Sequence, residues 1–175
     1  MSDTPSRYIY TMQHSREISD LLQSLFVAEL IAPSRCIWLV SPWISDIPVI
    51  DNQSNQFTSL EPSWARKQVY ISDVIARLVE MGTTVRIGTR DNDHNELFIE
   101  RVTSKISEHN KFSIKTSPLL HNKGLLADDF YLNGSMNFTY NGISISEEYV
   151  QLVTNAKEIA ENRVTFAARW GDEAP

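Results

Sequence analysis

Residues 121–137, HNKGLLADDFYLNGSMN, carry a group of chemically active side chains along what the pattern predicts to be two short strands joined by a turn. These side chains are His121, Lys123, Ser135 and Asn137. A strand in a packed domain normally carries side chains that fill a core, whereas Gly124 and Gly134 carry none. The segment therefore predicts a functional surface, and the surrounding chain must supply the scaffold.

The chain around this segment alternates between helical and extended patterns. Helices are predicted over residues 11–34, 69–82, 93–108 and 156–170, where apolar residues recur at helical spacing. Strands are predicted over residues 35–44, 83–89, 112–117 and 148–155, and the first is largely apolar up to Pro42, as in strands buried on both faces. This alternation predicts an α/β fold, a layered α/β/α sandwich with a mixed sheet, because some strands follow each other too closely for a crossover helix.

Length and local composition predict one domain with one irregular region. The chain of 175 residues has the usual size of a single domain. Residues 1–7 are expected to form a flexible N-terminus. Residues 45–67 are polar and aperiodic, so a long loop or insertion is expected there, and loops of this length are often functional or mobile.

Charge and composition limit the partners. The formal charge is −6 and the pI is near 5.2, which argues against a protein that coats DNA through many basic contacts but allows a local basic site. No apolar run approaches the roughly 18 residues of a membrane span, and the first residues do not read as a signal peptide, so a cytoplasmic protein without membrane contact is expected. The single Cys36 cannot form an internal disulfide, and the four dispersed histidines predict no metal site.

The order of residues in the opening segment is specific. His121, Lys123 and Asp128 stand in the pattern H-x-K-x4-D, followed by Gly134-Ser135-x-Asn137. This resembles the HKD motif of the phospholipase D superfamily, and the resemblance extends from residue 35 to residue 154. The glutamate that opens the next strand in the superfamily falls on Glu148, with Glu147 as the alternative one residue earlier, and the position two residues before Glu148 is Ser146 where many members have asparagine.

The chain has one motif, whereas the superfamily's active site needs two. It therefore resembles the small bacterial endonucleases that dimerise and supply one motif from each chain. The resemblance implies a homodimer that cleaves nucleic acid, DNA before RNA, without a metal or other cofactor. It also implies a possible place in bacterial restriction or phage defence, with partner proteins. A phospholipase or phosphatidyl transferase, and a catalytically silent scaffold subunit of the same fold, are the alternatives.

The motif residues suit attack on a phosphodiester. A neutral imidazole on His121 could form a covalent phosphohistidine, while a second, protonated imidazole donates to the leaving oxygen. Lys123 is expected on the same face of the strand as His121, where its ammonium would contact the phosphate. Asn137 and Ser135 could donate to the phosphate oxygens, Glu148 could hold an imidazole nitrogen, and Gly134 leaves room for substrate.

The remaining candidates have weaker support. Asp128, beside Asp129 at the turn, is expected to be structural rather than catalytic, and Ser135 could be only a turn residue. Trp43 lies at the end of one predicted strand and Arg90 follows another, and the resemblance implies that such strand ends face the substrate cleft. Both are therefore candidate substrate-binding residues; a core or surface role is the alternative.

The resemblance also implies that the 45–67 loop lies beside the substrate cleft and that two copies meet next to the motif. Phe57 and Trp64 in the 45–67 loop could stack on an unpaired base, unless the loop is a mobile insertion. The contact between the two copies is expected beside the motif, at Tyr131, Phe138 and residues 139–145.

Overall fold

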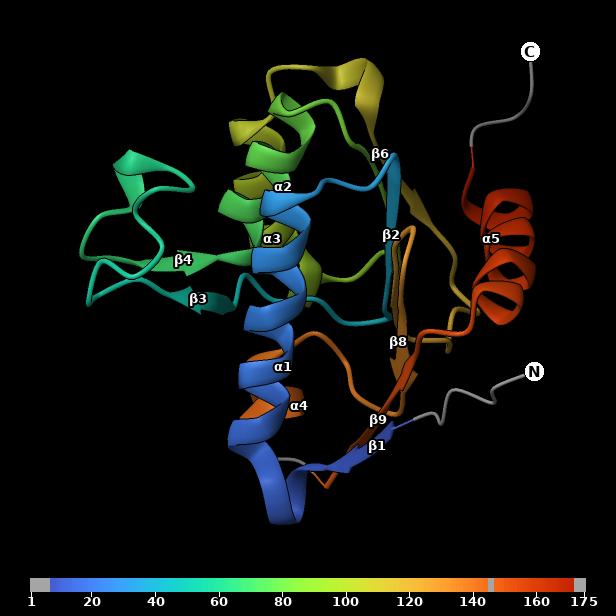
Figure 1. The fold of residues 1–175 in the computed structure, drawn as a ribbon. Helices are drawn as coiled ribbons and strands as arrows, with labels where there is room; N and C mark the ends of the chain where they lie inside the picture. The colour runs from blue at the N-terminus through green and yellow to red at the C-terminus, as the bar shows by residue number, and fades with distance from the viewer. Residues whose placement is uncertain (1–6, 145–146, 172–175) are drawn as a thin grey trace.

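The computed structural model describes residues 7–144 and 147–171, apart from the side chains of residues 11–15 (Figure 1). In this part of the chain a mixed sheet has the strand order β1-β9-β8-β7-β2-β5-β6. Its strands are β1 (Arg7–Tyr10), β2 (Cys36–Val40), β5 (Thr84–Thr89), β6 (Phe112–Thr116), β7 (Gly124–Leu126), β8 (Tyr131–Gly134) and β9 (Tyr149–Val153). Strands β2, β5 and β6 are parallel, whereas β7, β8, β9 and β1 continue the sheet in antiparallel pairs.

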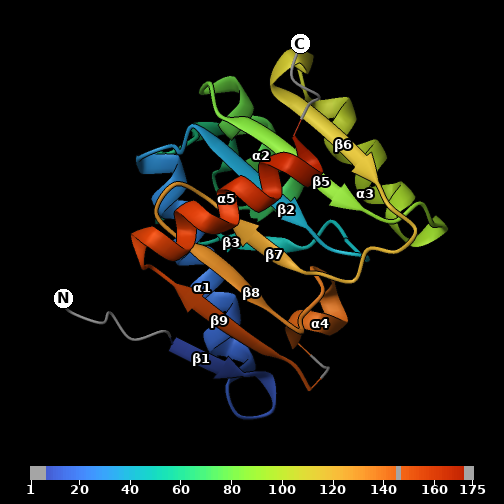
Figure 2. The same cartoon turned by 90° about the vertical axis from the view of Figure 1, so that its right-hand side faces the viewer.

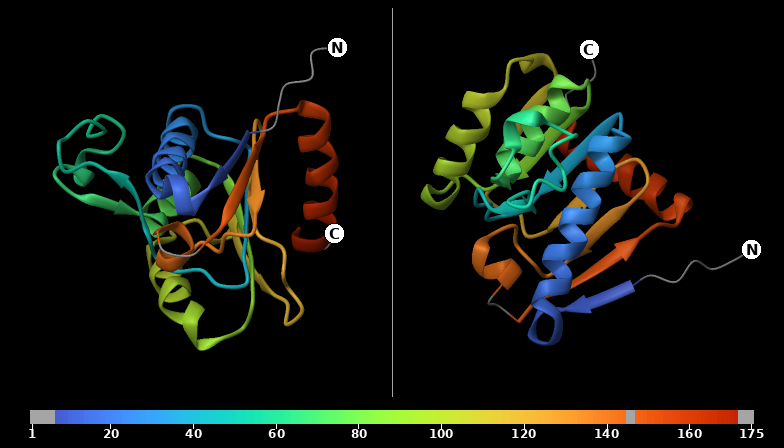
Figure 3. Two further views of the ribbon diagram at one scale, coloured as in Figure 1. Left: turned by 90° about the horizontal axis from the view of Figure 1, so that it is seen from below. Right: turned by 60° about the vertical axis from the view of Figure 1, so that its left-hand side comes forward.

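Helices cover the two faces of the sheet unequally (Figures 1 and 3). On one face lie α1 (Thr11–Ile31), α2 (Ile71–Glu80), α3 (Asp93–Lys105) and the short α4 (Tyr140–Ser144). On the other face lies α5 (Ala156–Trp170). The predicted α/β class with three layers and a mixed sheet is confirmed.

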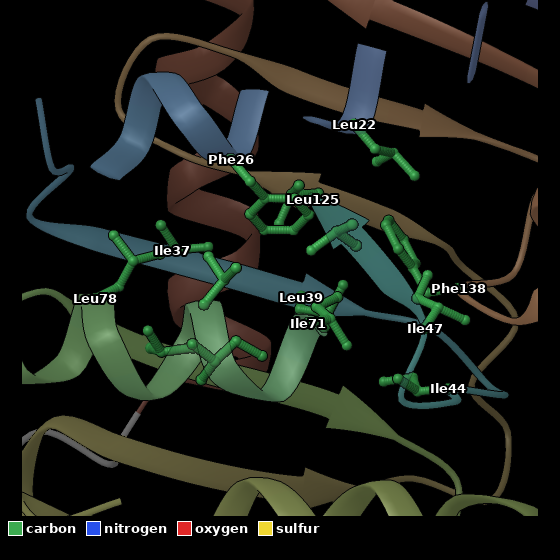
Figure 4. Close-up of a cluster of buried hydrophobic side chains, with 14 of the residues drawn as sticks. Leu22, Phe26, Ile37, Leu39, Ile44, Ile47, Ile71, Leu78, Leu125 and Phe138 are labelled. Atoms are coloured by element: carbon green, nitrogen blue, oxygen red, sulfur yellow. The ribbon is translucent and has the colours of Figure 1, made fainter. Parts of the chain in front are cut away.

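The central strand β2 shows why the sheet needs a layer on each face. Ile37 and Leu39 point into the larger core, between the sheet and α1, α2 and α3 (Figure 4). Trp38 and Val40 point into a second core under α5, with Phe166 and Trp170 of that helix. Successive side chains of a strand point to opposite faces of the sheet. An apolar run such as CIWLV therefore needs a packed layer on each face.

The predicted helices and strands are largely found, with differences at their ends. Helix α1 ends at Ile31, just before Pro33, and α3 ends at Lys105 rather than at residue 108. Strand β1 and helix α4 were not predicted, and Arg7, the first residue of β1, was expected to belong to a flexible N-terminus. Both elements are only four or five residues long, too short for a periodic pattern to stand out. The other expected flexible residues, 1–6, lie outside the described part of the chain.

The long loop or insertion expected over residues 45–67 is found only in part, because the segment contains one strand of a hairpin and is ordered by internal contacts. Strand β3 (Pro48–Asp51) pairs with β4 (Gln68–Tyr70), and the connection contains a 3₁₀ turn at Pro62–Trp64. The side chain of Asn52 is fully buried and organises this connection: its amide nitrogen donates to the carbonyl of Trp64 at 3.0 Å, and its amide oxygen accepts from the backbone N–H of Phe57 at 2.7 Å. Polar residues here satisfy one another internally, so polarity did not indicate disorder.

The β3–β4 hairpin also lies away from the place expected for it. It packs against α1 and α2 and extends outside the helical layer, away from the sheet (Figures 1 and 3). Trp64 is buried and Phe57 is half-buried against the core. The two aromatic rings therefore support the insertion from within, and the expected stacking platform for a base is wrong.

No helix in the described residues is long and apolar enough to cross a membrane.

Candidate active site

The strand directions bring the motif to one end of the sheet. Strands β2, β5 and β8 end there, whereas β7 and β9 begin there, because each antiparallel neighbour reverses the direction of the chain. We call this end the site rim; it lies at the lower right of the sheet in Figure 2. The two halves of the motif, His121–Lys123 before β7 and Ser135–Asn137 after β8, meet at the rim although a turn separates them in sequence.

His121 and Lys123 lie just before the strand, not on it as expected. β7 begins at Gly124, whose partner on β2 is Val40, and the chain after Val40 turns away at Ser41-Pro42. Residues 121–123 therefore have no partner on the β2 side. The His121 side chain is exposed, and the Lys123 ammonium donates to the backbone carbonyl of His121 at 2.8 Å.

Lys123 is the electrostatic centre of the rim. Partial burial lowers the pKa of its ammonium below the ordinary lysine value, the Glu148 carboxylate opposes this shift, and the Arg90 guanidinium adds to it. The three charged groups therefore act on one another at the rim. A second cation near Lys123 increases the attraction of this end of an acidic protein for a phosphate.

Ser135 joins the end of β8 to the start of β9. Its hydroxyl donates to the Glu148 carboxylate and accepts from the backbone N–H of Tyr149 at 3.0 Å. Glu148 is half-buried at this point, whereas Glu147 is exposed. Of the two candidate glutamates, the structure thus brings Glu148 into contact with the motif; Ser146 lies outside the described residues.

Gly134 permits this close approach of β8 to β9. Its φ is +145°, and a Cβ atom there would lie 2.2 Å from the carbonyl oxygen of Tyr149. Only glycine fits such a backbone at such a distance. The glycine is thus needed by the backbone itself, in addition to any room it leaves for substrate.

Asn137 is held by the strand at the middle of the sheet. Its amide oxygen accepts a hydrogen bond from the Ser41 hydroxyl at 3.2 Å, and Ser41 is fully buried just after β2. The same hydroxyl donates to the carbonyl of Trp43 at 2.9 Å, so its proton is shared between two acceptors. The amide NH₂ group of Asn137 remains the donor that can face a substrate.

One buried amide at the rim, that of Asn95, was not among the predicted site residues. Asn95 on α3 is fully buried; its NH₂ group donates to the carbonyls of Pro42 at 3.0 Å and Arg90 at 2.8 Å. Its amide oxygen accepts from the backbone N–H of Ile44 at 2.9 Å. It therefore fixes the loops after β2 and β5 together. The signal in the sequence was an asparagine on the same helical stripe as the buried Phe98 and Val102.

Trp43 and Arg90 lie together on these two loops. The Arg90 guanidinium lies 5.1 Å from the centre of the Trp43 ring, and its Nε donates to the carbonyl of Leu120 at 2.7 Å. Leu120 directly precedes His121, so the pair lies beside the motif. Trp43 is partly exposed, and it forms a side wall of the rim together with the half-buried Arg90.

Asp128 lies at the opposite end of the sheet. Its carboxylate accepts from the backbone N–H of Arg35 at 3.1 Å and forms ion pairs with the guanidinium groups of Arg35 and Arg163. Burial alone would raise the pKa of Asp128, but these hydrogen bonds and charges lower it below the ordinary value. Asp128 thus fastens α5 and the start of β2 to the end of β7, far from the reacting groups.

The other histidines lie in different parts of the fold, outside the motif. Among the described residues, no three histidine, cysteine, aspartate or glutamate side chains are placed to hold a metal ion. His94 is exposed, and its Nε2 lies 2.9 Å from the Ser45 hydroxyl at the rim. His109 is also exposed and precedes β6 at the far end, and the side chain of His14 lies outside the described part.

The expected contact surface between two copies is partly wrong. Phe138 is only 1% exposed and belongs to the larger core, so it cannot contact another chain. Tyr131 packs edge-on against Phe166 of α5, with 5.6 Å between ring centres. In α4, by contrast, Tyr140 is 61% exposed beside the rim, and Ile145 lies outside the described residues.

The fold occurs in solved structures of low sequence identity. Nuc from Salmonella typhimurium, a phospholipase D family member, matches with a TM-score of 0.61 and 12% identity over 94% of this chain and 93% of that chain. NucT from Helicobacter pylori matches with a TM-score of 0.60 and 11% identity over 94% of both chains. TrmBL2, an archaeal chromatin protein with a novel mode of DNA binding, matches with a TM-score of 0.53 and 12% identity over 96% of this chain and 53% of that chain.

Sequence comparison identifies the family. No match was found among curated proteins. The model of the PLD-like domain of cardiolipin synthase matches residues 48–170, which is more than half of the chain and includes the whole motif. Membership of this superfamily points to a phosphodiester-hydrolysing enzyme. The chain belongs to the phospholipase D superfamily, as a PLD-like domain.

Proposed function

We propose that this chain cleaves nucleic acid by forming a covalent phosphohistidine on His121, in a site that two copies complete. The observation that carries the proposal is the site rim, where His121 and Lys123 meet Asn137 and Glu148. A nucleophile, a fixed cation and an amide donor at one place are what attack on a phosphodiester requires.

The first step exchanges one bond to phosphorus for another. A nitrogen of the neutral His121 imidazole attacks phosphorus, the bond to the leaving oxygen breaks, and that oxygen takes a proton from a second imidazole. Lys123 and the NH₂ group of Asn137 offset the negative charge that grows on the phosphate oxygens. In the second step, the second imidazole accepts a proton from water, which attacks the phosphohistidine and releases His121.

The second imidazole is proposed to come from the His121 of another copy. The motif occurs once in the chain, and a twofold axis beside the rim would place two motifs together with one self-complementary interface. The exposed Tyr140 of α4, which follows Asn137 after two intervening residues, is the candidate contact that remains after Phe138 is excluded. Two copies would also double the local positive charge while the rest of the surface stays acidic.

Nucleic acid is the proposed substrate, with DNA before RNA. The fold is shared with TrmBL2, an archaeal chromatin protein that binds DNA, and with Nuc, a phospholipase D family member. A role in bacterial restriction or phage defence, with protein partners, is part of the same proposal. The intact set His121, Lys123 and Asn137 disfavours a silent scaffold, because a subunit without catalysis would have no use for all three.

The test is hydrolysis of bis-p-nitrophenyl phosphate, with and without excess EDTA, followed by single- and double-stranded DNA, RNA and lipid vesicles. Wild-type protein should cleave the diester and nucleic acid in EDTA, and His121→Ala should reduce the rate by several orders of magnitude. His109→Ala is the matched control, because this exposed histidine lies at the far end of the sheet. No hydrolysis at any pH would favour the scaffold, and cleavage of vesicles alone would favour a lipid enzyme.

A further inference from the structure

A polar groove opens beside the motif on the face of the sheet that carries α5. It has a volume of about 350 Å³ and is lined by Asn122, Lys123, Tyr131, Asn133, Gly134, Tyr149, Gln151, Glu158 and Asn162. Lys123 and Gly134 belong to the motif, so the groove is continuous with the proposed active site. We call it the tyrosine–amide groove.

The sheet register explains how these side chains gather. Asn133 on β8 lies opposite Gln151 on β9, and Gln151 lies opposite Tyr8 on β1, so all three side chains share one face. Tyr149, two residues before Gln151 on the same face, lies opposite Tyr10. Helix α5 crosses only part of this face and leaves the rim ends of β8 and β9 and the strand β1 uncovered (Figure 2).

The tyrosines form a partly exposed aromatic surface along one side of the groove. Tyr149 is 40% exposed, and Tyr8 and Tyr10 are each 55% exposed. The rings of Tyr10 and Tyr149 lie 6.1 Å apart, centre to centre, at 39° to one another. Exposed aromatic rings of this kind provide surfaces on which nucleobases stack.

The amides supply hydrogen-bonding groups that are not already used. In the described part of the chain, the side chains of Asn122, Asn133 and Gln151 make no hydrogen bond to another residue. Each amide presents a donor and an acceptor side by side, which matches the edge of a nucleobase. Two of these residues, Asn133 and Gln151, are partly buried in the sheet, so their positions are restricted.

The charges of the groove favour a neutral base over a run of phosphates or a second copy of the chain. The groove has Lys123 at its motif end and Glu158 on α5, so it does not attract a run of phosphates. A second copy would bury several amides and a carboxylate, which is costly unless each one finds a partner. A nucleotide fits this arrangement, because its phosphate can bind at Lys123 while its neutral base lies among the amides and tyrosines of the groove.

We propose that the tyrosine–amide groove binds the nucleobase beside the scissile phosphate, and that this base must be unpaired; the proposal rests on the proposed function. In a duplex the base faces are stacked and the pairing edges are occupied, so neither tyrosine rings nor amides could reach them. The chain would therefore act on single strands, or on bases extruded from a duplex, in preference to intact duplex.

The test compares Tyr149→Ala and Gln151→Ala with wild-type protein on a short single-stranded oligonucleotide and on bis-p-nitrophenyl phosphate. The ratio of the two kcat/KM values, oligonucleotide over chromogenic diester, should fall about ten- to a hundredfold, as expected for one lost stacking or base contact. Tyr70→Ala and Gln53→Ala are matched controls, because both residues are exposed on or beside the β3–β4 hairpin, and they should leave the ratio unchanged. Wild-type protein should also cleave the single strand faster than a hairpin duplex of the same sequence.

An unchanged ratio in both groove variants, or equal cleavage of single strand and duplex, would overturn the proposal. Loss of the dimer in Tyr149→Ala, measured by analytical ultracentrifugation, would instead assign this face to the contact between copies. If wild-type protein hydrolyses neither substrate, the proposed function fails. Fluorescence anisotropy of a labelled single strand then tests whether the tyrosine–amide groove binds an unpaired base. Weaker binding by Tyr149→Ala than by wild type would support it, and no binding by wild type would overturn it.

Discussion

The hydroxyl of Ser41 donates a hydrogen bond to the side-chain oxygen of Asn137 at 3.2 Å, across 96 positions of sequence. Ser41 follows the central strand β2, and its carbonyl accepts from the hydroxyl of Thr89 at 2.8 Å at the end of β5. The motif asparagine is therefore oriented by the parallel half of the sheet, although the motif itself belongs to the antiparallel half. The NH₂ group of Asn137 is presented to the rim by a contact outside the motif.

Replacing Ser41 should impair the chemical step. In Ser41→Ala, Asn137 loses the hydrogen bond that fixes its amide, and we expect kcat on bis-p-nitrophenyl phosphate to fall about tenfold, the rate equivalent of a typical hydrogen bond at the upper end of its range. Ser45→Ala is the control, because Ser45 lies on the same loop as Ser41 but its hydroxyl contacts His94 of α3 rather than the motif. A lower melting temperature with unchanged kcat would show that Ser41 only supports packing.

The alkaline limb of the pH–rate profile should report Lys123. Because burial lowers the pKa of this lysine, its charge is lost at a lower pH than that of an ordinary lysine, about 10.4, and kcat/KM should decline accordingly. Glu148 raises the pKa of Lys123, so Glu148→Gln should move the limb to lower pH. Lys123→Arg should move it upward and out of range, because a guanidinium stays charged. A limb that stays in place in both variants would assign it to another group.

Gly134 should tolerate no side chain. Gly134→Ala combines a φ of +145° with a Cβ atom 2.2 Å from the Tyr149 carbonyl oxygen, so the free energy of unfolding should fall by about 3 kcal/mol or more. Gly82→Ala is the matched control, since Gly82 has a φ of +102° but its nearest atom would be 3.5 Å away. Its loss in urea denaturation should be about 1 kcal/mol. Equal losses of unfolding free energy in the two variants would show that the close approach of β9 to Gly134 does not contribute to the cost.

Asp128 should stabilise the fold in a pH-dependent manner. Its pKa is lowered in the folded protein, so its contribution is complete above the unfolded pKa of about 3.9 and is lost as the pH falls through the folded value. Asp128→Asn should therefore lower the free energy of unfolding by about 2 kcal/mol at pH 7, as expected for charged hydrogen bonds, and the difference from wild type should shrink below about pH 4. A difference that stays constant with pH would exclude the ion pairs as its cause.

Mixed dimers should test the shared site. If wild-type chains are re-equilibrated with His121→Asn chains, each mixed dimer has one motif imidazole and cannot both attack and protonate. Activity should then follow the fraction of wild-type homodimers, the square of the fraction of wild-type chains, in a titration with bis-p-nitrophenyl phosphate. Activity proportional to the wild-type chains, or sedimentation of an active monomer, would contradict the shared site.

The sequence alone was sufficient for the fold class and the motif, because both depend on local patterns. Helical spacing along α1 and the apolar run of β2 reflect burial directly, and the motif is read from residues within one short segment. The short elements β1, β3, β4 and α4 gave no such signal. The insertion at residues 45–67 was misread because Asn52 and its partners satisfy polar groups inside the fold.

The tertiary structure decided how the motif is held and what surrounds it. Asn95 and Ser41 act on the rim through contacts with residues distant in sequence, and their local sequence resembles ordinary helix and loop. The tyrosine–amide groove likewise depends on which residues of β8, β9 and β1 lie opposite one another. Register between strands is set by the packing of the whole sheet, so a side-chain constellation built across strands is fixed only when the chain has folded.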